Sequence, residues 1–171
     1  MAELTPQERL QPALLDRLAD NEPDKKLEPR EERVMTRARL RQAVLRDLAW
    51  LFNTTKLDSR QDFAGYPFAG CSVINFGLPA LSGETASTLD VIELEGSIKQ
   101  AIIDFEPRID PSSLQVEAVV TDSQLDRHNV ISVQIRGNLW AQPVPLELLL
   151  RTDVDLETGQ VEIRDLARSE V

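Results

Sequence analysis

The hydrophobic pattern of this chain changes its period near Pro107, and that change restricts the fold more than any other feature. Before Pro107, apolar residues recur at steps of three and four, which is typical of helices with one buried face. After it, they alternate with polar residues, which is typical of strands. The sequence therefore predicts an α+β fold, in which N-terminal helices lead into an antiparallel β-meander of about four strands.

Three helices are predicted, at residues 8–20, 33–53 and 89–105. The second has the longest apolar face. The third ends where a proline follows, because the residue before a proline is pushed out of the helical region. Thr88 or Asp90 is the candidate N-cap of this third helix.

Two connecting regions separate these helices. Residues 21–32 are polar and contain two prolines, which predicts a flexible linker. We therefore expect residues 1–32 to form an N-terminal arm, with a short helix and this linker, and residues 33–171 to form a single domain. Residues 54–88 are rich in loop-forming residues, and the first part of 72–79 is expected to form a short strand.

The strands are predicted from alternating apolar residues in the last third of the chain. Asp155 to Gly159 reads as a tight hairpin turn between the last two of them, and Gly137 is a candidate β-bulge within the second. The four predicted strands are Leu114 to Val120, Ile131 to Leu139, 145–154 and 160–165.

The net charge of −10 is unevenly distributed. Residues 1–60 hold 12 Lys and Arg against 11 Asp and Glu, which gives +1, and residues 61–171 hold 7 against 18, which gives −11. This excess of acid argues against general nucleic-acid binding, which needs cations to neutralise phosphates. Arg33, Arg37 and Arg41 still lie four residues apart on one helix face. This stripe is a solvated face, a face paired with the acidic remainder of the chain, or a docking surface for an acidic partner.

The chain has the features of a protein from a reducing compartment. Its one cysteine, Cys71, cannot form an internal disulfide. The N-terminus has no basic stretch leading into an apolar run, so no signal peptide is predicted. No window approaches the ~18 apolar residues that a membrane span needs. We therefore expect a cytoplasmic protein that is not inserted in a membrane.

Residues that commonly carry catalysis are sparse. The one histidine, His128, stands beside Asn129 at the start of a predicted strand and reads as a surface turn residue. There is no Cys/His cluster and no glycine-rich phosphate loop, so no metal or cofactor is expected. Asp104 and Glu106 imitate a glycosidase pair, but such a pair also needs a sugar-binding cleft, and aromatic residues are only 5% of the chain. No catalytic residue is predicted.

The segment from Glu106 to Arg108 differs from the other charged parts of the sequence, because a proline separates its two charges. The proline fixes the backbone where the last helix ends and the sheet begins. It holds an acid and a base on either side of a rigid corner, and alternate residues of extended backbone project to the same side. The two charges either form an intramolecular ion pair that sets the corner or make a two-pronged contact with a partner.

Segments spread along the chain also carry a family resemblance, through their order and spacing. They are Leu14 to Leu18, Val44 to Asn53, Ser72 to Pro79, Ile98 to Arg108, Pro143 to Pro145 and Asp155 to Gly159. In these segments the sequence resembles the TssE family, the baseplate subunits of bacterial type VI secretion systems. More distantly, it resembles the wedge proteins of contractile phage tail baseplates.

The resemblance implies a structural subunit that joins TssF and TssG into baseplate wedges and links them to the sheath proteins TssB and TssC, with TssK as a further possible contact. It places the protein in the bacterial cytoplasm, at a baseplate docked on the inner membrane. By position, Glu106, Pro107 and Arg108 are the implied assembly contact. The sheet resembles the strand-exchange region of sheath proteins, and an unpaired edge at 160–165 would offer main-chain groups to a strand of another chain.

The same family has also carried a lysozyme-like label. The alternative function is therefore a peptidoglycan-cleaving hydrolase. Nothing in the residues themselves independently supports that label, so we expect a protein that is not an enzyme.

Overall fold

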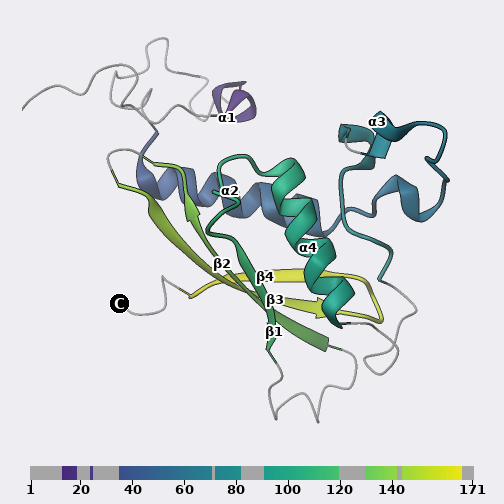
Figure 1. Ribbon diagram of the computed structural model, residues 1–171. Helices are drawn as coiled ribbons and strands as arrows, with labels where there is room; N and C mark the ends of the chain where they lie inside the picture. Colours follow the sequence, from purple (N-terminus) through teal and green to yellow (C-terminus); the bar gives the residue numbers. More distant parts are fainter. Residues whose placement is uncertain are drawn as a thin grey trace, which may run out of the picture.

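A four-stranded antiparallel sheet lies at the centre of the molecule (Figure 1). The computed structural model describes residues 13–18, 24, 35–70, 72–81, 91–119, 130–141 and 144–166. The sheet order follows the chain order, so the strands form a meander with β1 and β4 at its edges. This arrangement confirms the predicted α+β fold. The strands are β1 (Gln115–Val119), β2 (Val130–Leu139), β3 (Leu146–Asp155) and β4 (Val161–Asp165).

Two long helices, α2 (Arg37–Phe52) and α4 (Val91–Phe105), supply the helical part of the core. Their apolar faces join the alternating buried residues of the sheet in one hydrophobic cluster. Each fully buried leucine or isoleucine in it contributes about 1.5–3 kcal/mol relative to an exposed position. In the described parts of the chain, four shorter helices and turns lie outside this framework. The short helices are α1 (Leu14–Leu18) and α3 (Pro67–Gly70), and single 3₁₀ turns occupy Leu57–Ser59 and Val73–Asn75.

Both edges of the sheet are flanked by a helix that caps outward-facing main-chain groups. On β1, Glu95 of α4 accepts a hydrogen bond from the Ala118 N–H, with Oε1 2.6 Å from the nitrogen. On β4, Asn53 holds Val161 from both sides. The Val161 N–H donates to Asn53 Oδ1 at 3.0 Å, and Asn53 Nδ2 donates to the Val161 carbonyl at 2.9 Å. Side chains here satisfy groups that an added strand would otherwise pair with.

An ion pair links helix α2 to the last strand, β4. Arg41 of α2 forks onto Asp165, with Nε 2.5 Å from Oδ2 and Nη2 2.7 Å from Oδ1, and its Nη1 donates to the Glu147 carbonyl at 3.0 Å. At Arg41, the predicted pairing of the basic stripe with the acidic remainder of the chain is therefore confirmed. Arg37 is exposed.

The short strand predicted in the first part of 72–79 is wrong, because Val73–Asn75 is a 3₁₀ turn. The buried side chain of Asn75 explains the difference. Its Nδ2 donates to the Gly70 carbonyl at 2.9 Å, and its Oδ1 accepts from the Asp58 N–H at 2.9 Å. These bonds give the backbone a local alternative to a strand ladder.

Gly77 closes this loop region in a conformation that side chains rarely adopt. Its φ is 133°, and a Cβ built there would lie 2.2 Å from the Thr54 carbonyl oxygen. The close approach lets the Leu78 N–H donate to Thr54 O and the Lys56 N–H donate to Leu78 O, both at 2.8 Å. The loop is thereby fastened to the end of α2.

The predicted bulge at Gly137 is also wrong, because this residue pairs with Leu148 in an unbroken register between β2 and β3. The glycine instead makes room for a neighbour. A Cβ at Gly137 would lie 3.2 Å from Ile109 Cγ2, closer than ordinary van der Waals contact. Ile109, two residues after Pro107, is buried against the sheet at this point.

Several predictions lie outside the described residues. They concern Arg33, Cys71, Thr88, Asp90 and His128, and most of the linker at 21–32. The division into an arm and a domain stays a prediction. Within the described part of the chain, no helix has the length and apolar character to cross a bilayer.

Candidate functional site

The corner at Pro107 carries the chain from α4 onto the end of β2. The last helical hydrogen bond of α4 runs from the Glu106 N–H to the Ile102 carbonyl at 2.8 Å. After the proline, the Trp140 N–H donates to the Arg108 carbonyl at 2.7 Å. Residue 109 then forms an antiparallel bridge with residue 139. The backbone of the corner is thus fixed at both ends, by a helix and by a sheet.

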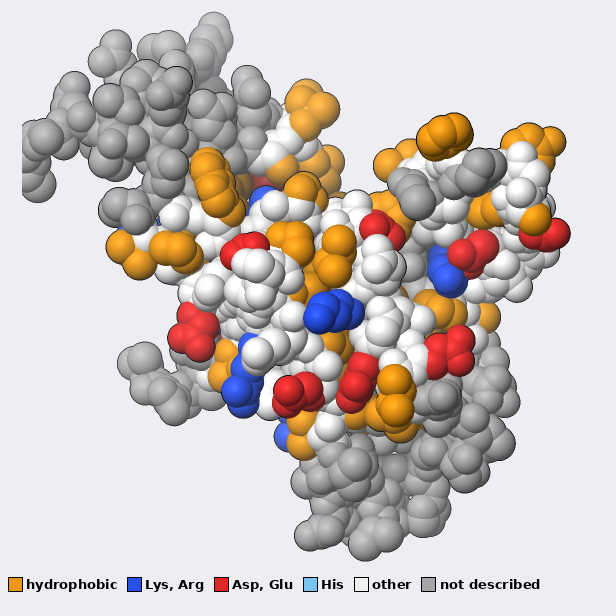
Figure 2. Space-filling model, viewed as in Figure 1, with side chains coloured by type: hydrophobic (Ala, Val, Ile, Leu, Met, Phe, Trp, Pro, Cys, Tyr) orange, Lys and Arg blue, Asp and Glu red, His pale blue; other side chains and the backbone are white. Residues whose placement is uncertain are grey.

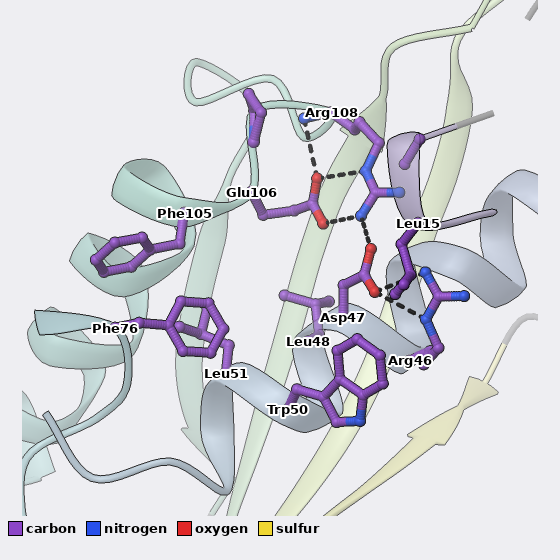
Figure 3. Close-up of a pocket in the computed structure, with 12 residues that line it drawn as sticks. Leu15, Arg46, Asp47, Leu48, Trp50, Leu51, Phe76, Phe105, Glu106 and Arg108 are labelled. Carbon is purple, nitrogen blue, oxygen red and sulfur yellow. Dashed lines mark hydrogen bonds and ion pairs between the residues drawn. The ribbon is translucent and has the colours of Figure 1, made fainter. Parts of the chain in front are cut away.

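Glu106 and Arg108 form an ion pair across this corner. Glu106 is buried, with 3% of its surface exposed, and both of its carboxylate oxygens are used. Oε1 accepts from the Arg108 main-chain N–H at 3.1 Å and from Nε at 2.7 Å, and Oε2 accepts from Nη2 at 2.5 Å. The intramolecular ion pair, one of the two sequence interpretations, is therefore present (Figure 3).

The pair extends through α2 to α1 as a row of alternating charges. Arg108 Nη2 also donates to Asp47 Oδ2 at 2.5 Å, and Arg46 Nε donates to Asp47 Oδ1 at 2.9 Å. Arg46 Nη1 then donates to Asp16 Oδ1 of α1 at 2.6 Å. We call these five residues, Asp16, Arg46, Asp47, Glu106 and Arg108, the corner network.

Burial and charge act in opposite directions on the arginines of the corner network. Partial burial lowers the pKa of Arg108, but the hydrogen bonds and charges of Glu106 and then Asp47 outweigh burial and raise that pKa. The hydrogen bond that Arg46 donates to Asp16 is the main cause that raises the pKa of Arg46, against burial, with Asp47 adding to it. Both guanidinium groups therefore stay charged at any physiological pH.

The corner network also leaves polar atoms without partners. Among the described residues, the buried side-chain nitrogen and oxygen atoms that lack a hydrogen bond are Asp16 Oδ2, Arg46 Nη2 and Arg108 Nη1. Arg46 Nη2 lies 2.8 Å from Asp47 Oδ1, an ion-pair contact that is too oblique for a hydrogen bond. All three atoms belong to this one network, although buried polar groups are usually paired.

A pocket of about 410 Å³ opens beside the network. Its wall is largely apolar. Phe76 and Phe105 meet edge to face, with ring centroids 5.2 Å apart, and the half-exposed Trp50 lies under the Arg46 guanidinium at 5.1 Å. Leu15 of α1 points toward Asp47 and completes the wall (Figure 3). The pocket can therefore bind an apolar side chain next to an acidic or carbonyl oxygen.

The arrangement does not resemble a glycosidase site. Asp104 is exposed and accepts a hydrogen bond from Gln100 Nε2 at 2.8 Å, whereas Glu106 is buried and held by Arg108. The other carboxylate of the pocket, Asp47, is bound by two arginines. Neither lining carboxylate is free to serve as a proton donor or a nucleophile. Among the described residues, no group of His, Cys, Asp and Glu side chains is arranged to hold a metal.

Sequence reasoning identified the Glu106, Pro107 and Arg108 corner but missed its partners. Asp47 and Asp16 each lie within a predicted helix, and neither was predicted to bind the corner. Asp16 and Arg108 approach α2 from segments 30 and 61 residues away along the chain, so no local pattern reports their meeting.

Comparison with known proteins gives the family. A family model described as baseplate wedge protein gp25 matches residues 38–144, more than half of the chain. The chain belongs to this family of baseplate wedge proteins. Neither the curated proteins nor the solved structures gave a match.

This match confirms the resemblance to TssE and to phage wedge proteins, since TssE belongs to the same family. It supports a structural role in a baseplate, and the family is one of structural proteins rather than enzymes. The matched residues include α2, the corner and β2. They do not include α1.

Proposed function

We propose that the chain serves as the TssE-type subunit of a type VI secretion baseplate, in which it joins the wedge subunits TssF and TssG. The wedge-protein family supports a baseplate role. The observation that carries the proposal further is the corner itself: a rigid turn with a partly exposed arginine that lines an apolar pocket. Such a site suits protein assembly because it combines an anchoring pocket with a directed charge.

Glu106, Pro107 and Arg108 are the proposed contact with the wedge subunits, and their internal ion pair serves that contact. Glu106 fixes the Arg108 guanidinium by accepting two hydrogen bonds from it, and it accepts a third from the Arg108 main-chain N–H. Pro107 is exposed at the tip of the corner. Arg108 Nη1 is buried and has no hydrogen-bond partner. A side chain that is already held in place binds a partner without first losing the conformational entropy of a long side chain.

The sheet is the proposed link to the sheath proteins TssB and TssC, by addition of a strand at its β4 edge. β4 pairs with β3 alone and is therefore an edge strand. Main-chain groups alternate in direction along such a strand, so Ile163 faces outward like Val161. Since Asn53 already holds Val161, an added strand pairs from Ile163 onward or displaces Asn53. TssK is the remaining proposed neighbour, and the assembled baseplate lies in the cytoplasm at the inner membrane.

Co-purification tests this function. The full chain, carrying an affinity tag, is expressed with TssF and TssG, and the recovered complex is quantified. We expect wild type to retain both subunits and Arg108→Lys to lose most of them, because lysine keeps the charge but not the fork. The control is Arg164→Lys, on an exposed ion pair of β4. Circular dichroism and thermal melting establish that each variant is folded.

The possible results separate the assembly role from a structural one. Recovery of TssF and TssG with the control but not with a folded Arg108→Lys supports the corner as the contact. A wild-type chain that retains neither subunit refutes the proposed function. Equal recovery with the wild type and both variants refutes the contact at the corner.

A further inference from the structure

Within the described part of the chain, few interactions hold helix α1 to the rest of the molecule. It has five residues, too few for an independently stable helix. Its leucines are largely unburied, with Leu14 71%, Leu15 47% and Leu18 73% exposed. Its described polar anchor is the ion pair between Asp16 and Arg46, whose side chains are 16% and 35% exposed. An ion pair of this exposure contributes little and is easily exchanged for another.

The anchor of α1 is also part of the candidate assembly site. Arg46 binds Asp16 on one side and Asp47 on the other, and Asp47 in turn binds Arg108. Without Asp16, the remaining network has two acids and two bases, and Arg46 Nη1 lacks the acceptor that Asp16 provides. Asp16 thus supplies, from within the chain, the carboxylate that binds Arg46.

The position of α1 restricts access to the pocket. Leu15 lines it and points toward Asp47, between the two arginines of the network (Figure 3). Figure 2 shows apolar side chains exposed on the rest of the same face. A partner that places an apolar side chain against Trp50 and an acidic group on Arg46 needs the space that α1 occupies.

We infer that α1 is a displaceable cover of the corner pocket, and that Asp16 occupies on Arg46 the position that an acidic side chain of the TssF–TssG wedge takes on assembly. This inference rests on the proposed function, because it names TssF–TssG as the competitor. Docking of α1 and binding of the wedge exclude each other at Arg46. The apparent affinity for the wedge is lowered by the fraction of molecules in which α1 is docked.

Two observations support competition over a purely structural helix. Asp16 Oδ2, which belongs to the carboxylate that holds α1 on Arg46, is buried without a hydrogen-bond partner, so this contact is imperfectly satisfied. In addition, the match to the wedge-protein family begins at residue 38, after α1. The helix therefore lies outside the matched residues and beside the proposed contact.

The test measures cover release and wedge binding in the full chain. Asp16→Asn removes the anchor, and Asp24→Asn removes the same charge from an exposed residue of the same N-terminal segment. Acrylamide quenching in a Trp140→Phe background reports on Trp50 alone, since the chain has two tryptophans. Dissociation constants for purified TssF–TssG are measured for both variants and for wild type.

We expect Asp16→Asn to increase quenching of Trp50 and to tighten binding of TssF–TssG about fivefold, the effect of removing one partly exposed ion pair from the closed state. Asp24→Asn changes neither value. If quenching of Trp50 is unchanged in Asp16→Asn, Asp16 does not hold α1, and the proposed cover is refuted. If quenching increases but TssF–TssG binds Asp16→Asn no more tightly than wild type, α1 does not compete with the wedge, and the proposed cover is refuted as well. If wild type binds no TssF–TssG at all, the proposed function fails and the inference falls with it.

Discussion

At the scale of single residues, the corner depends on one buried carboxylate. Glu106 accepts three hydrogen bonds from Arg108, and the sequence alone placed these two charges on either side of a proline. The sequence was sufficient to predict this pair because its two residues lie two positions apart. It did not reach Asp47 and Asp16, because their meeting with the arginines is fixed by how α1, α2 and α4 pack. No spacing along the chain encodes that packing.

Neutralising this carboxylate is expected to destabilise the fold. Glu106→Gln keeps the shape but leaves the Arg108 guanidinium with a neutral partner, and a buried hydrogen bond to a charged group contributes about 1.5–3 kcal/mol. We expect a loss of about 2 kcal/mol in the free energy of unfolding, measured by urea denaturation. The control is Glu162→Gln, in the exposed pair with Arg164, with an expected change below about 0.5 kcal/mol. Equal effects of the two substitutions would contradict the structural role of the corner pair.

The hairpin turn between β3 and β4 depends on the charge of Asp155. Its Oδ1 accepts from the N–H groups of Thr158 at 3.1 Å and Glu157 at 2.8 Å, and these bonds lower the pKa of Asp155. A group whose pKa is lowered on folding stabilises the fold above its unfolded value, near 3.9, and loses that effect as the pH falls through the folded value.

The stability difference between wild type and Asp155→Ala is therefore expected to be constant from neutral pH down to about pH 5 and to shrink below about pH 4. Urea midpoints across this range measure it. Asp155→Asn provides the control, since it keeps an acceptor oxygen but does not titrate. A difference that stays constant down to pH 2.5 would mean that the charge of this carboxylate is not what stabilises the turn.

At the scale of elements, long periodic segments were predictable and short ones were not. The predicted helices at 33–53 and 89–105 correspond to α2 and α4, and the strand pattern corresponds to β2 and β3, because many apolar residues report on one buried face. Residues 72–76 have a brief strand-like pattern, but the Asn75 side chain fixes a 3₁₀ turn there. One polar side chain outweighs a weak periodic signal when the segment is this short.

Helix α4 contains a glycine whose replacement is expected to stabilise the fold. Gly96 is exposed in mid-helix, and a Cβ added there meets nothing within 4 Å. Gly96→Ala therefore removes backbone freedom from the unfolded chain without strain, and we expect a gain of about 1 kcal/mol in urea denaturation. The same change at Gly137 is expected to destabilise, because the new Cβ lies 3.2 Å from Ile109 Cγ2. Destabilisation by Gly96→Ala would show that α4 is not packed as described.

At the scale of the whole molecule, the uneven charge of the sequence has a structural counterpart. Arg41 of α2 binds Asp165 from the acidic remainder of the chain, whereas Arg46 binds Asp47 of α2 itself and Asp16 of α1. The buried hydrophobic residues that the structure describes run from Met35 to Val161, so none of them comes from the predicted N-terminal arm. The described core is built without that arm.

This distribution predicts that residues 33–171 fold without residues 1–32. Removing the arm deletes the Asp16–Arg46 ion pair and the partial cover of Leu15, and neither belongs to the hydrophobic core. We expect the free energy of unfolding to fall by no more than about 1 kcal/mol, with an unchanged dependence on urea concentration. A large loss would place the arm inside the cooperative unit and the domain boundary elsewhere. If the shortened chain instead unfolds cooperatively near the wild-type midpoint, the wedge domain is stable without the arm. This independence is the physical condition for α1 to leave the corner while the rest of the fold stays intact.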